Sequence, residues 1–510
     1  MESKLISWGI IVFLLATLGI GVWASKQIKG DSVNFLVAGR GMVLPLAAAT
    51  LMAQSVDSNA TLGNTDLSAE FGFWAGASLP IGLAICLLLT GLFYAKPMNR
   101  MGLITLPDFY RVKYGRMTEV VASIIMVLSF AFLLAGNLVA GGYLFQTFLG
   151  TSYTAGVIGV ALLVFVYTVS GGLFAVAYTD VVQVGIALVG ALVLIGYVSI
   201  NYGLEIPAGT GPLALEQLTA PEAGAAINWA TLLALGLGDI VAIDFMARVF
   251  AADSPETAQR ACFIGCMGTL IIGVPFSLVA LSSGSILEQA GVVADGPVLF
   301  SLLENVIPPI LSLVIIVAIM AASLSTGDGA ILGTSSVMAH NIMGIRHDDT
   351  HGMHNGAGHQ NNQSAGDRLL LITRVMAAVI TLMGVFFALR VPQTGSLLLL
   401  AFDLGFAGLV VPLTGGLFWA RSTWQGAMAC ITIGSLTRLV FFVLMPTMFG
   451  ADNTLLYIPN SLFTPDFDGI PTLISPIVGL IAFVVVSNMT YIPPTRDRHP
   501  LEQRMPEMMR

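Results

Sequence analysis

The stretch PLAAATLMAQSVDSNATLGNT, residues 45–65, starts as an apolar helix and becomes polar halfway along. A lipid-facing helix would not tolerate this, because polar groups at membrane depth must line a cavity or pack inside protein. The stretch LLALGLGDIVAIDFMARVF, residues 232–250, also places glycines and two acids within an apolar segment. We expect both helices to be discontinuous. The alternative is that both are merely segments with buried polar packing.

The composition is that of a polytopic membrane protein. Of 510 residues, 56% are hydrophobic and 10% are charged, whereas soluble domains carry about 25% charged residues. This excludes a soluble enzyme, a nucleic-acid binder and a disordered chain. The net charge of −8 argues against a polybasic partner surface. No nucleophile–base pair or phosphate loop is evident, so we do not expect an enzyme.

Thirteen segments have about the 20 apolar residues that a membrane-spanning helix needs. They lie near 5–24, 42–64, 72–96, 118–147, 153–172, 176–201, 229–250, 259–286, 308–342, 368–390, 395–419, 424–447 and 470–490. We expect an all-α polytopic membrane protein.

Basic residues predict the orientation of these helices. If the thirteen helices alternate in direction, one side receives Lys26, Lys29, Arg40, Lys96, Arg100, Arg111, Lys113, Arg116, Arg248, Arg260, Arg346, Arg368, Arg421 and the four arginines of the tail. The other side receives Lys4 and Arg390. We therefore expect an outside N-terminus and a cytoplasmic C-terminus in a plasma (inner) membrane.

The second and seventh helices, which carry the expected breaks, are five helices apart. This spacing is typical of an inverted repeat of two five-helix halves. The expected divisions are a peripheral first helix with its loop at 1–41, a first repeat at 42–201, an extracellular loop at 202–228, a second repeat at 229–419 that includes a cytoplasmic His-rich loop at 344–367, two peripheral helices at 420–492 and a tail at 493–510.

Acidic residues inside the spans are costly and mark function by default. The six are Asp57, Asp180, Asp239, Asp244, Asp328 and Asp403, whereas Arg438 is the one arginine assigned to the interior of a span. This imbalance indicates that bound cations supply positive charge, and oxygen-rich sites suit hard cations such as Na⁺. Asp403 and Arg438 fall at comparable depth on neighbouring helices, so we expect them to form an ion pair.

The segment SLSTGDGAILGTSS, residues 323–336, concentrates hydroxyl groups on one helix, with Asp328 among them. Small residues alone would also fit helix–helix packing in a membrane. The acid favours an ion site, because packing does not require a carboxylate.

These stretches together carry a family resemblance. The quoted motifs are VAGRGM (37–42), GLFYAKPM (91–98), YTVSGGLFAVAYTDVVQ (167–183), FMARVFAADS (245–254) and SLSTGDGAILGTSS (323–336). The chain resembles the sodium:solute symporter family over nearly its whole length, most of all its high-affinity choline transporter and sodium/proline branches. The resemblance implies a LeuT-type five-plus-five core, alternating access and Na⁺ as the coupling ion, without another cofactor.

The resemblance also implies ion sites. The first sodium site would consist of the carbonyls of Ala53, Val56 and Ala322 with the hydroxyls of Ser325 and Thr326. A second cation site would involve Asp180, Ser325 and Asp328. Two alternatives to a second Na⁺ are a proton shared by the two acids and an Asp180 that merely caps its helix.

We expect the solute site between the two helix breaks. The candidate residues are Gln54, Ser55, Asp57, Ser58, Asn59, Trp74, Asn137, Asp239, Ala242 and Asp244. The choline branch encloses its quaternary ammonium in aromatic rings, but the matching positions here are Ser55 and Ala242. The candidates favour a small polar solute, cationic or zwitterionic, such as an amine or amino acid.

The cytoplasmic loop carries His347, His351, His354 and His359, which could hold a transition metal. A flexible solvated linker is the alternative. A metal-binding loop would suggest a transition-metal permease as an alternative function. A membrane-embedded solute sensor is a second alternative. As partners we expect the solute, Na⁺ and the lipid bilayer, with no nucleic acid and no obligate protein partner.

Overall fold

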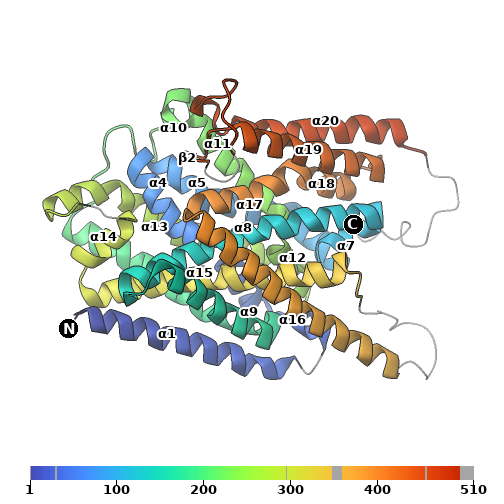
Figure 1. The fold of residues 1–510 in the computed structure, drawn as a ribbon, viewed down its shortest axis with the longest axis horizontal. Coiled ribbons are helices and arrows are strands. Elements are labelled where there is room, and N and C mark those ends of the chain that lie inside the picture. The colour runs from blue at the N-terminus through green and yellow to red at the C-terminus, as the bar shows by residue number, and fades with distance from the viewer. Residues whose placement is uncertain (1, 29–30, 294–295, 347–358, 454–456, 494–510) are drawn as a thin grey trace.

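The computed structural model describes residues 2–28, 31–293, 296–346, 359–453 and 457–493. These residues form a bundle of long helices (Figure 1). Helix α1 (Glu2–Ala24) lies along one side of the bundle, and α19 (Trp424–Leu444) and α20 (Ile470–Thr490) lie along the opposite side. The start of α1 and the end of α20 are at opposite ends of the bundle, as an odd number of spans requires.

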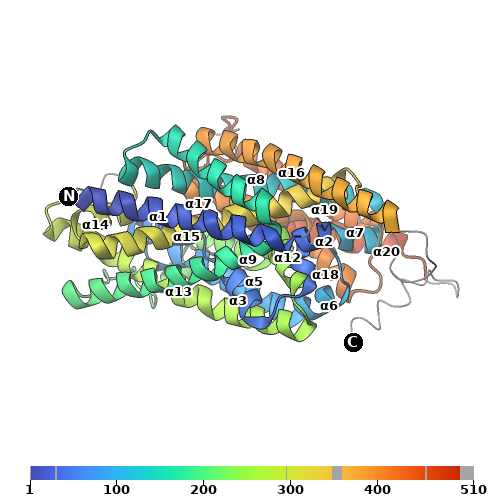
Figure 2. The ribbon, with the colours of Figure 1, turned by 90° about the horizontal axis from the view of Figure 1, so that it is seen from below.

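The other main helices build the rest of the bundle, seen from a second direction in Figure 2. In chain order they are α3 (Leu44–Ser55), α4 (Asn64–Phe71), α5 (Phe73–Leu89), α6 (Ala95–Arg100), α8 (Arg116–Leu149), α9 (Tyr153–Asn201), α11 (Ala225–Leu233), α12 (Ile243–Ala251), α13 (Pro255–Gln289), α15 (Pro309–Val337), α16 (His359–Arg390), α17 (Thr394–Gly408) and α18 (Val410–Phe418).

The remaining elements connect them. These are the helices α2 (Ser32–Val37), α7 (Pro107–Tyr114), α10 (Glu216–Thr219) and α14 (Val298–Asn305), the 3₁₀ turns η1 (Ser25–Gln27), η2 (Ala38–Arg40), η5 (Pro221–Ala223), η7 (Asp239–Val241) and η9 (Pro465–Phe467), and the π-helical turns η3 (Asn59–Gly63), η4 (Thr90–Tyr94), η6 (Ala234–Gly238) and η8 (Met338–Ile342). The described residues contain one antiparallel pair of two-residue strands, β1 (Thr447–Met448) and β2 (Ala451–Asp452).

The described residues include nine helices long and apolar enough to cross a membrane, or eleven spans if each of two bent helix pairs counts as one. Two features account for the difference from thirteen. The 49-residue α9 contains a break and can supply two spans, and the short helices α3 and α4 can together form one. The count of thirteen itself stays a prediction.

The break in α9 is at Gly172, where φ is +52° and ψ is −149°. A residue with a side chain rarely adopts this conformation. Before the break, Tyr167 donates its hydroxyl to the Leu324 carbonyl at 3.1 Å. After it, Tyr197 reaches the Val306 carbonyl, before the start of α15. A Cβ at Gly190 would meet Ala318 of α15, so the segment after Gly172 runs antiparallel to α15.

The first expected discontinuity is present. Helix α3 ends at Ser55, and Val56 has non-helical torsions, φ −108° and ψ 82°. Side chains then bond the backbone groups that the break frees: Asp57 accepts from the Ala60 amide at 2.6 Å, and Thr61 donates to the Asp57 carbonyl at 3.2 Å. Such local bonding is what lets a polar sequence leave the helix within a membrane protein.

The second discontinuity is present as well. The π-helical turn η6 and the 3₁₀ turn η7 interrupt the helix, and its two parts differ in direction by 48°. Gly238 permits the close approach of α17, because a Cβ there would lie 2.5 Å from the Phe402 carbonyl oxygen.

The two broken helices are joined by their backbones at one end. The Met42 amide donates to the Ala251 carbonyl, and the Asp253 amide donates to the Met42 carbonyl, both at 3.0 Å. Asn99 donates to the carbonyls of Val249 and Ala252 at 2.8 and 3.0 Å. This joint, between residues 42 and 251–253, connects the start of α3 to the end of α12.

Candidate functional site

The end of α3 lies against the hydroxyl-rich part of α15. Ser325 donates to the Ala53 carbonyl at 3.1 Å and to the Ala322 carbonyl at 3.0 Å. Thr326 approaches the Gln54 carbonyl at 3.5 Å, and Gln54 donates its side-chain amide to the Ser325 carbonyl. The structure thus brings most of the predicted first sodium site together. The fifth residue, Val56, follows the last residue of α3.

A small cavity lies between the two helix breaks. Its lining includes four predicted solute residues, Gln54, Asp57, Asp239 and Asp244, together with Thr326. The volume is about 10 Å³, roughly the space that one water molecule occupies. A solute therefore requires the helices to move apart.

Its apolar lining residues, Leu83, Leu133, Phe245 and Phe402, are absent from the predicted set. No sequence signal distinguishes them from other buried hydrophobic residues. Phe402 also lines a second cavity of about 10 Å³, together with Ala242 and Phe130. Ala242 is therefore near the predicted site, in an apolar compartment.

Two predicted solute residues lie elsewhere. Ser55 shares a hydrogen bond with Thr269 of α13, so its hydroxyl faces that helix. Trp74 stands at the start of α5 and donates its indole N–H to the Pro212 carbonyl at 3.1 Å. It lies nine residues before Leu83, or about 13 Å along a helix. Trp74 packs against the loop before α10 and is not among the residues that line this cavity, so its role in solute binding stays a prediction.

Of the remaining three, Ser58 and Asn137 have described side chains. They bond each other, with the Ser58 hydroxyl donating to Asn137 Oδ1 at 2.9 Å. The Asn137 carbonyl also accepts from Ser323 of α15 at 2.8 Å. These contacts connect the polar segment after α3 to α8 and α15. The side chain of Asn59 is outside the described structure.

The structure corrects the position of Arg248, which the orientation argument assigned to the cytoplasmic surface. Arg248 is 1% exposed and donates to Asp180 at 3.3 Å. It also donates to the Thr50 hydroxyl at 2.8 Å and to the Asp244 carbonyl at 3.0 Å, and Thr50 bonds Asp180. Tertiary packing buries a residue that sequence position alone placed at a helix end. The second broken helix therefore contributes a guanidinium to the interior.

The predicted second cation site must now include this guanidinium. Asp328 interacts electrostatically with Asp180 and accepts from the Tyr167 hydroxyl at 2.7 Å. One oxygen of each carboxylate has no hydrogen-bond partner. With both acids ionised, Asp180, Asp328 and Arg248 together carry a formal charge of −1.

The predicted pair of Asp403 and Arg438 is in contact, with Arg438 Nε donating to Asp403 Oδ2. Thr472 donates to the same oxygen at 3.0 Å. The cluster connects α17, α19 and α20. Its place beside the peripheral helices indicates a structural role.

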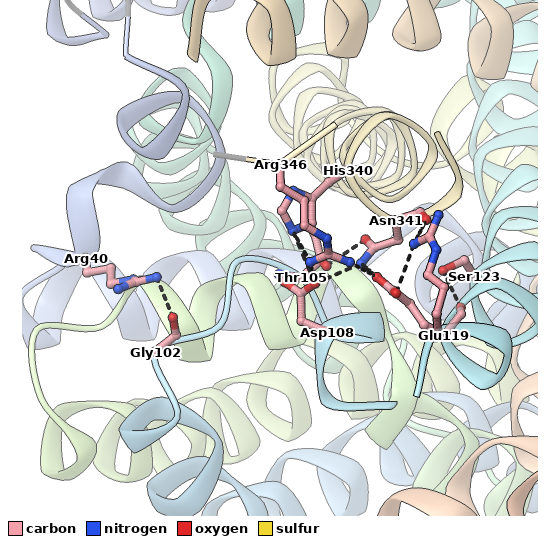
Figure 3. Close-up of polar contacts among 10 residues, drawn as sticks. Arg40, Gly102, Thr105, Asp108, Glu119, Ser123, His340, Asn341 and Arg346 are labelled. Atoms are coloured by element: carbon pink, nitrogen blue, oxygen red, sulfur yellow. Dashed lines mark hydrogen bonds and ion pairs between the residues drawn. The ribbon is translucent and has the colours of Figure 1, made fainter. Parts of the chain in front are cut away.

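A polar cluster that the sequence did not predict joins α7, α8 and η8 (Figure 3). Asp108 accepts from Asn341 at 2.9 Å and from Arg346 at 3.0 Å, and His340 lies 3.2 Å away. Glu119 accepts from Asn341 at 2.8 Å and pairs with Arg346. The signal that could have found it is Asp108 directly after Pro107, a typical helix start.

Burial tends to raise the pKa of Asp108. The hydrogen bond with His340 and the charges of His340 and Arg346 outweigh this, so the pKa lies well below its usual range. Asp108 therefore remains ionised at neutral pH.

This cluster adjoins a third cavity of about 10 Å³ at the predicted cytoplasmic end. Thr105 lines the cavity and donates its hydroxyl to Asn341 at 2.7 Å. Asp244 lines both this cavity and the central one. A route from the centre toward this end would pass Asp244 and Thr105.

The histidines of the predicted metal loop cannot be placed. His347, His351 and His354 are outside the described residues, as is the side chain of His359. Within the described residues, no group of three or more potential metal ligands is present. The metal interpretation stays untested.

Two discontinuous helices with ion and solute candidates between them define a secondary transporter. The model of the sodium:solute symporter family matches residues 35–434. The chain belongs to this family, as the motifs predicted.

The chain is 28% identical over 460 residues to a high-affinity choline transporter of Torpedo marmorata, covering 84% of this chain and 75% of that one. It is 26% identical over 443 residues to the high-affinity proline transporter PutP of Bacillus subtilis, covering 83% and 89%. A solved Na⁺-coupled sialic acid symporter superimposes with a TM-score of 0.71 at 16% identity, covering 98% of this chain and 99% of that one.

The predicted fold class is thereby confirmed. The protein is a multi-pass membrane transporter for Na⁺-coupled symport of a small organic solute, and it is not an enzyme.

Proposed function

We propose that one Na⁺ binds where α3 ends against α15, and that a cationic or zwitterionic solute binds between the two helix breaks. The ion would contact the Ala53, Val56 and Ala322 carbonyls and the Ser325 and Thr326 hydroxyls. The observation that carries this proposal is the contact of Ser325 with the carbonyls of both Ala53 and Ala322.

The chemistry of these oxygens suits sodium. Hydroxyl and carbonyl groups are neutral hard ligands, which hold a hard cation without the strong attraction of several carboxylates. A hydroxyl can turn its lone pairs toward an ion, because its hydrogen rotates freely. Such a site is expected to release Na⁺ readily.

The site also couples the ion to the helix break. Its ligands come from α3 and from α15, so Na⁺ would favour the arrangement in which both are in place. Two solute candidates are next to ion ligands in the same broken helix. Gln54 directly follows Ala53, and Asp57 directly follows Val56. An ion that binds one arrangement better than another shifts the population toward it, and this difference is the coupling free energy.

The acids of the central cavity favour a positive group on the solute. Asp57, Asp239 and Asp244 all line it, and the lining contains no lysine or arginine. A carboxylate-only solute would meet repulsion there. The relatives named for choline and for proline transport a quaternary ammonium and a zwitterion, and both carry a positive nitrogen.

We further propose that the N-terminus is outside and the C-terminus is cytoplasmic in a plasma (inner) membrane, with Na⁺ flowing inward. The basic residues at helix ends support this orientation. Arg248 no longer contributes to that argument, because it is buried. A cysteine-accessibility assay in intact cells, with single cysteines in a cysteine-free background at residues 4 and 421, tests it.

The test of transport is uptake by proteoliposomes of the purified protein. A thermal-shift screen against amines, amino acids, carboxylates and sugars, with and without Na⁺, first selects the radiolabelled solute, since binding stabilises the native state. Uptake is expected only with an inward Na⁺ gradient and should collapse when an ionophore dissipates that gradient. Uptake that follows a K⁺ gradient equally well, or stabilisation by carboxylates alone, would contradict the proposal.

A further inference from the structure

The central cavity has hydrogen-bond acceptors that lack donors. Both carboxylate oxygens of Asp239 and the amide oxygen of Gln54 are buried without a hydrogen-bond partner. Both residues line the cavity, and they are 1% and 4% exposed. The Gln54 nitrogen is engaged by the Ser325 carbonyl, which fixes the amide orientation. A ligand in this cavity must therefore bring N–H or O–H donors, because leaving a buried acceptor unpaired costs free energy.

The other two carboxylates already have backbone donors. Asp57 accepts from the Ala60 amide at 2.6 Å, and Asp244 accepts from the Phe245 amide at 2.7 Å. Arg248 also lies beside Asp244 and donates to its carbonyl. Asp239 has the Cys86 thiol beside it, and a thiol is only a weak donor. Asp239 is therefore the carboxylate of the cavity that is available to a ligand.

The space next to Asp239 is apolar. Phe402 separates the central cavity from the second cavity, which Phe130, Val241 and Ala242 also line. The rings of Phe130 and Phe402 pack edge to face, with centroids 6.4 Å apart. A rotation of Phe402 would join the two cavities. The joined space would offer a carboxylate at one end and aromatic walls at the other.

We propose that Asp239 binds the N–H-bearing ammonium group of the solute, and that an apolar substituent of the solute occupies the compartment of Phe130 and Phe402. The solute class is then a small primary or secondary amine, or an amino acid with an apolar side chain. This inference rests on the proposed solute site and specifies its ligand.

A quaternary ammonium fits poorly. It has no N–H group to donate to Asp239 or to Gln54. It would instead need ring faces within about 6 Å of the cation on several sides. Ser55, which faces Thr269, and Ala242 add no ring to those of Phe130, Phe245 and Phe402, which line the two cavities.

The experiment compares three matched probes on the full-length purified protein by thermal shift and isothermal titration calorimetry. The buffer contains about 100 mM Na⁺, at which the Debye screening length is about 10 Å. The probes are 2-phenylethylamine, its N,N,N-trimethyl derivative and 3-phenylpropionate. We expect the primary amine to bind at least about 30-fold more tightly than either analogue, since removing one partner of a buried charged hydrogen bond costs about 30-fold or more in affinity.

Asp239→Asn should abolish this preference, whereas Asp239→Glu should retain it in weaker form. Stabilisation by Na⁺ alone serves as the folding control, because the proposed ion ligands do not include Asp239. If Na⁺ raises the melting temperature of the wild type but the primary amine binds no more tightly than its analogues, the inference is overturned and the proposed ion site stands. If neither Na⁺ nor the amine raises the melting temperature of the wild type, the proposed function is overturned as well.

A second comparison does not depend on any variant of Asp239. Phe402→Ala enlarges the joined space without removing a polar group. We expect it to improve binding of 2-(1-naphthyl)ethylamine relative to 2-phenylethylamine. An unchanged ratio would show that the apolar substituent does not occupy this compartment.

Discussion

Arg248 and Asp180 form an ion pair inside the bundle, with Nη2 and Oδ2 3.3 Å apart and both side chains at most 1% exposed. The pair connects α12, the second half of a broken helix, to the part of α9 that follows Gly172. Thr50 of α3 bonds both partners. Both broken helices therefore contact the Asp180 carboxylate, α3 through Thr50 and α12 through Arg248.

This pair predicts a specific pattern of stability. Arg248→Met and Asp180→Asn should each destabilise the protein by roughly 3–5 kcal/mol, because each leaves an uncompensated buried group. The double variant should lose less than the sum of the two. Unfolding in detergent, followed by intrinsic fluorescence, measures this. Strictly additive losses would show that the contact contributes no coupling energy.

The proposed sodium site predicts a change in Na⁺ affinity. Ser325→Ala removes one ligand, so the Na⁺ concentration for half-maximal uptake should rise about tenfold, which corresponds to roughly 1.4 kcal/mol. Ser335→Ala is the matched control, since Ser335 is buried in the same helix and donates only to the Leu332 carbonyl at 3.0 Å. Equal effects of the two substitutions on Na⁺ dependence would argue against the site.

The second cation hypothesis predicts sigmoidal Na⁺ dependence, with a Hill coefficient above about 1. Asp328→Asn should bring the coefficient to about 1 while some uptake survives. Initial rates at constant ionic strength provide the measurement. A wild-type coefficient of 1 would instead indicate that Arg248 already supplies the counter-charge, and a lost pH dependence in the variant would favour a shared proton.

The cluster around Asp108 predicts stability that depends on its charge. Asp108→Asn should cost roughly 2–4 kcal/mol at neutral pH, because Arg346 and His340 each lose a buried charged partner, while Arg346 keeps its pair with Glu119. Since the pKa of Asp108 is lower in the folded state, its contribution is present above about pH 4 and disappears only as the pH falls through the folded-state pKa.

Thermal unfolding of the wild type and Asp108→Asn between neutral and acidic pH tests this sign. The difference should shrink only below about pH 4. Glu256→Gln is the control, because Glu256 pairs with Lys96 on the surface at 3.7 Å and should cost less than about 1 kcal/mol. A difference that instead shrinks as pH rises would contradict the assignment.

Gly172 predicts a strong backbone effect. Gly172→Ala requires a left-handed φ of +52° and would place Cβ 2.5 Å from the Phe35 carbonyl oxygen. We expect a loss of folded yield in size-exclusion chromatography. Gly185→Ala in the same helix has open space around the new Cβ, so stability should change by less than about 1 kcal/mol in the favourable direction. A well-folded Gly172→Ala variant would show that the break in α9 tolerates a side chain.

Sequence reasoning succeeded where the signal was a conflict between polarity and membrane depth. The polar run after Ala53 and the glycines before Asp239 predicted both breaks, because hydrocarbon does not solvate such groups. The contact of Asp403 with Arg438 followed from comparable depth and the cost of leaving either charge alone.

It failed where the answer depended on rotation about a helix axis. Ser55 is next to Gln54, yet it faces α13 rather than the cavity. Arg248 lies near the end of an apolar segment and was therefore assigned to the membrane surface, although packing of α12 turns it inward. The contacts of Asp108 involve residues more than 200 positions away, which no local pattern records.

The joint between residues 42 and 251–253 has a mechanical consequence. Its bonds connect backbone groups, so no single side-chain substitution at those positions removes them. The joined ends of the two broken helices must then move together as one rigid unit, while their opposite halves can separate. Amide hydrogens at Met42 and Asp253 would consequently exchange slowly in every state of the transport cycle, and the residues beyond each break would record the motion.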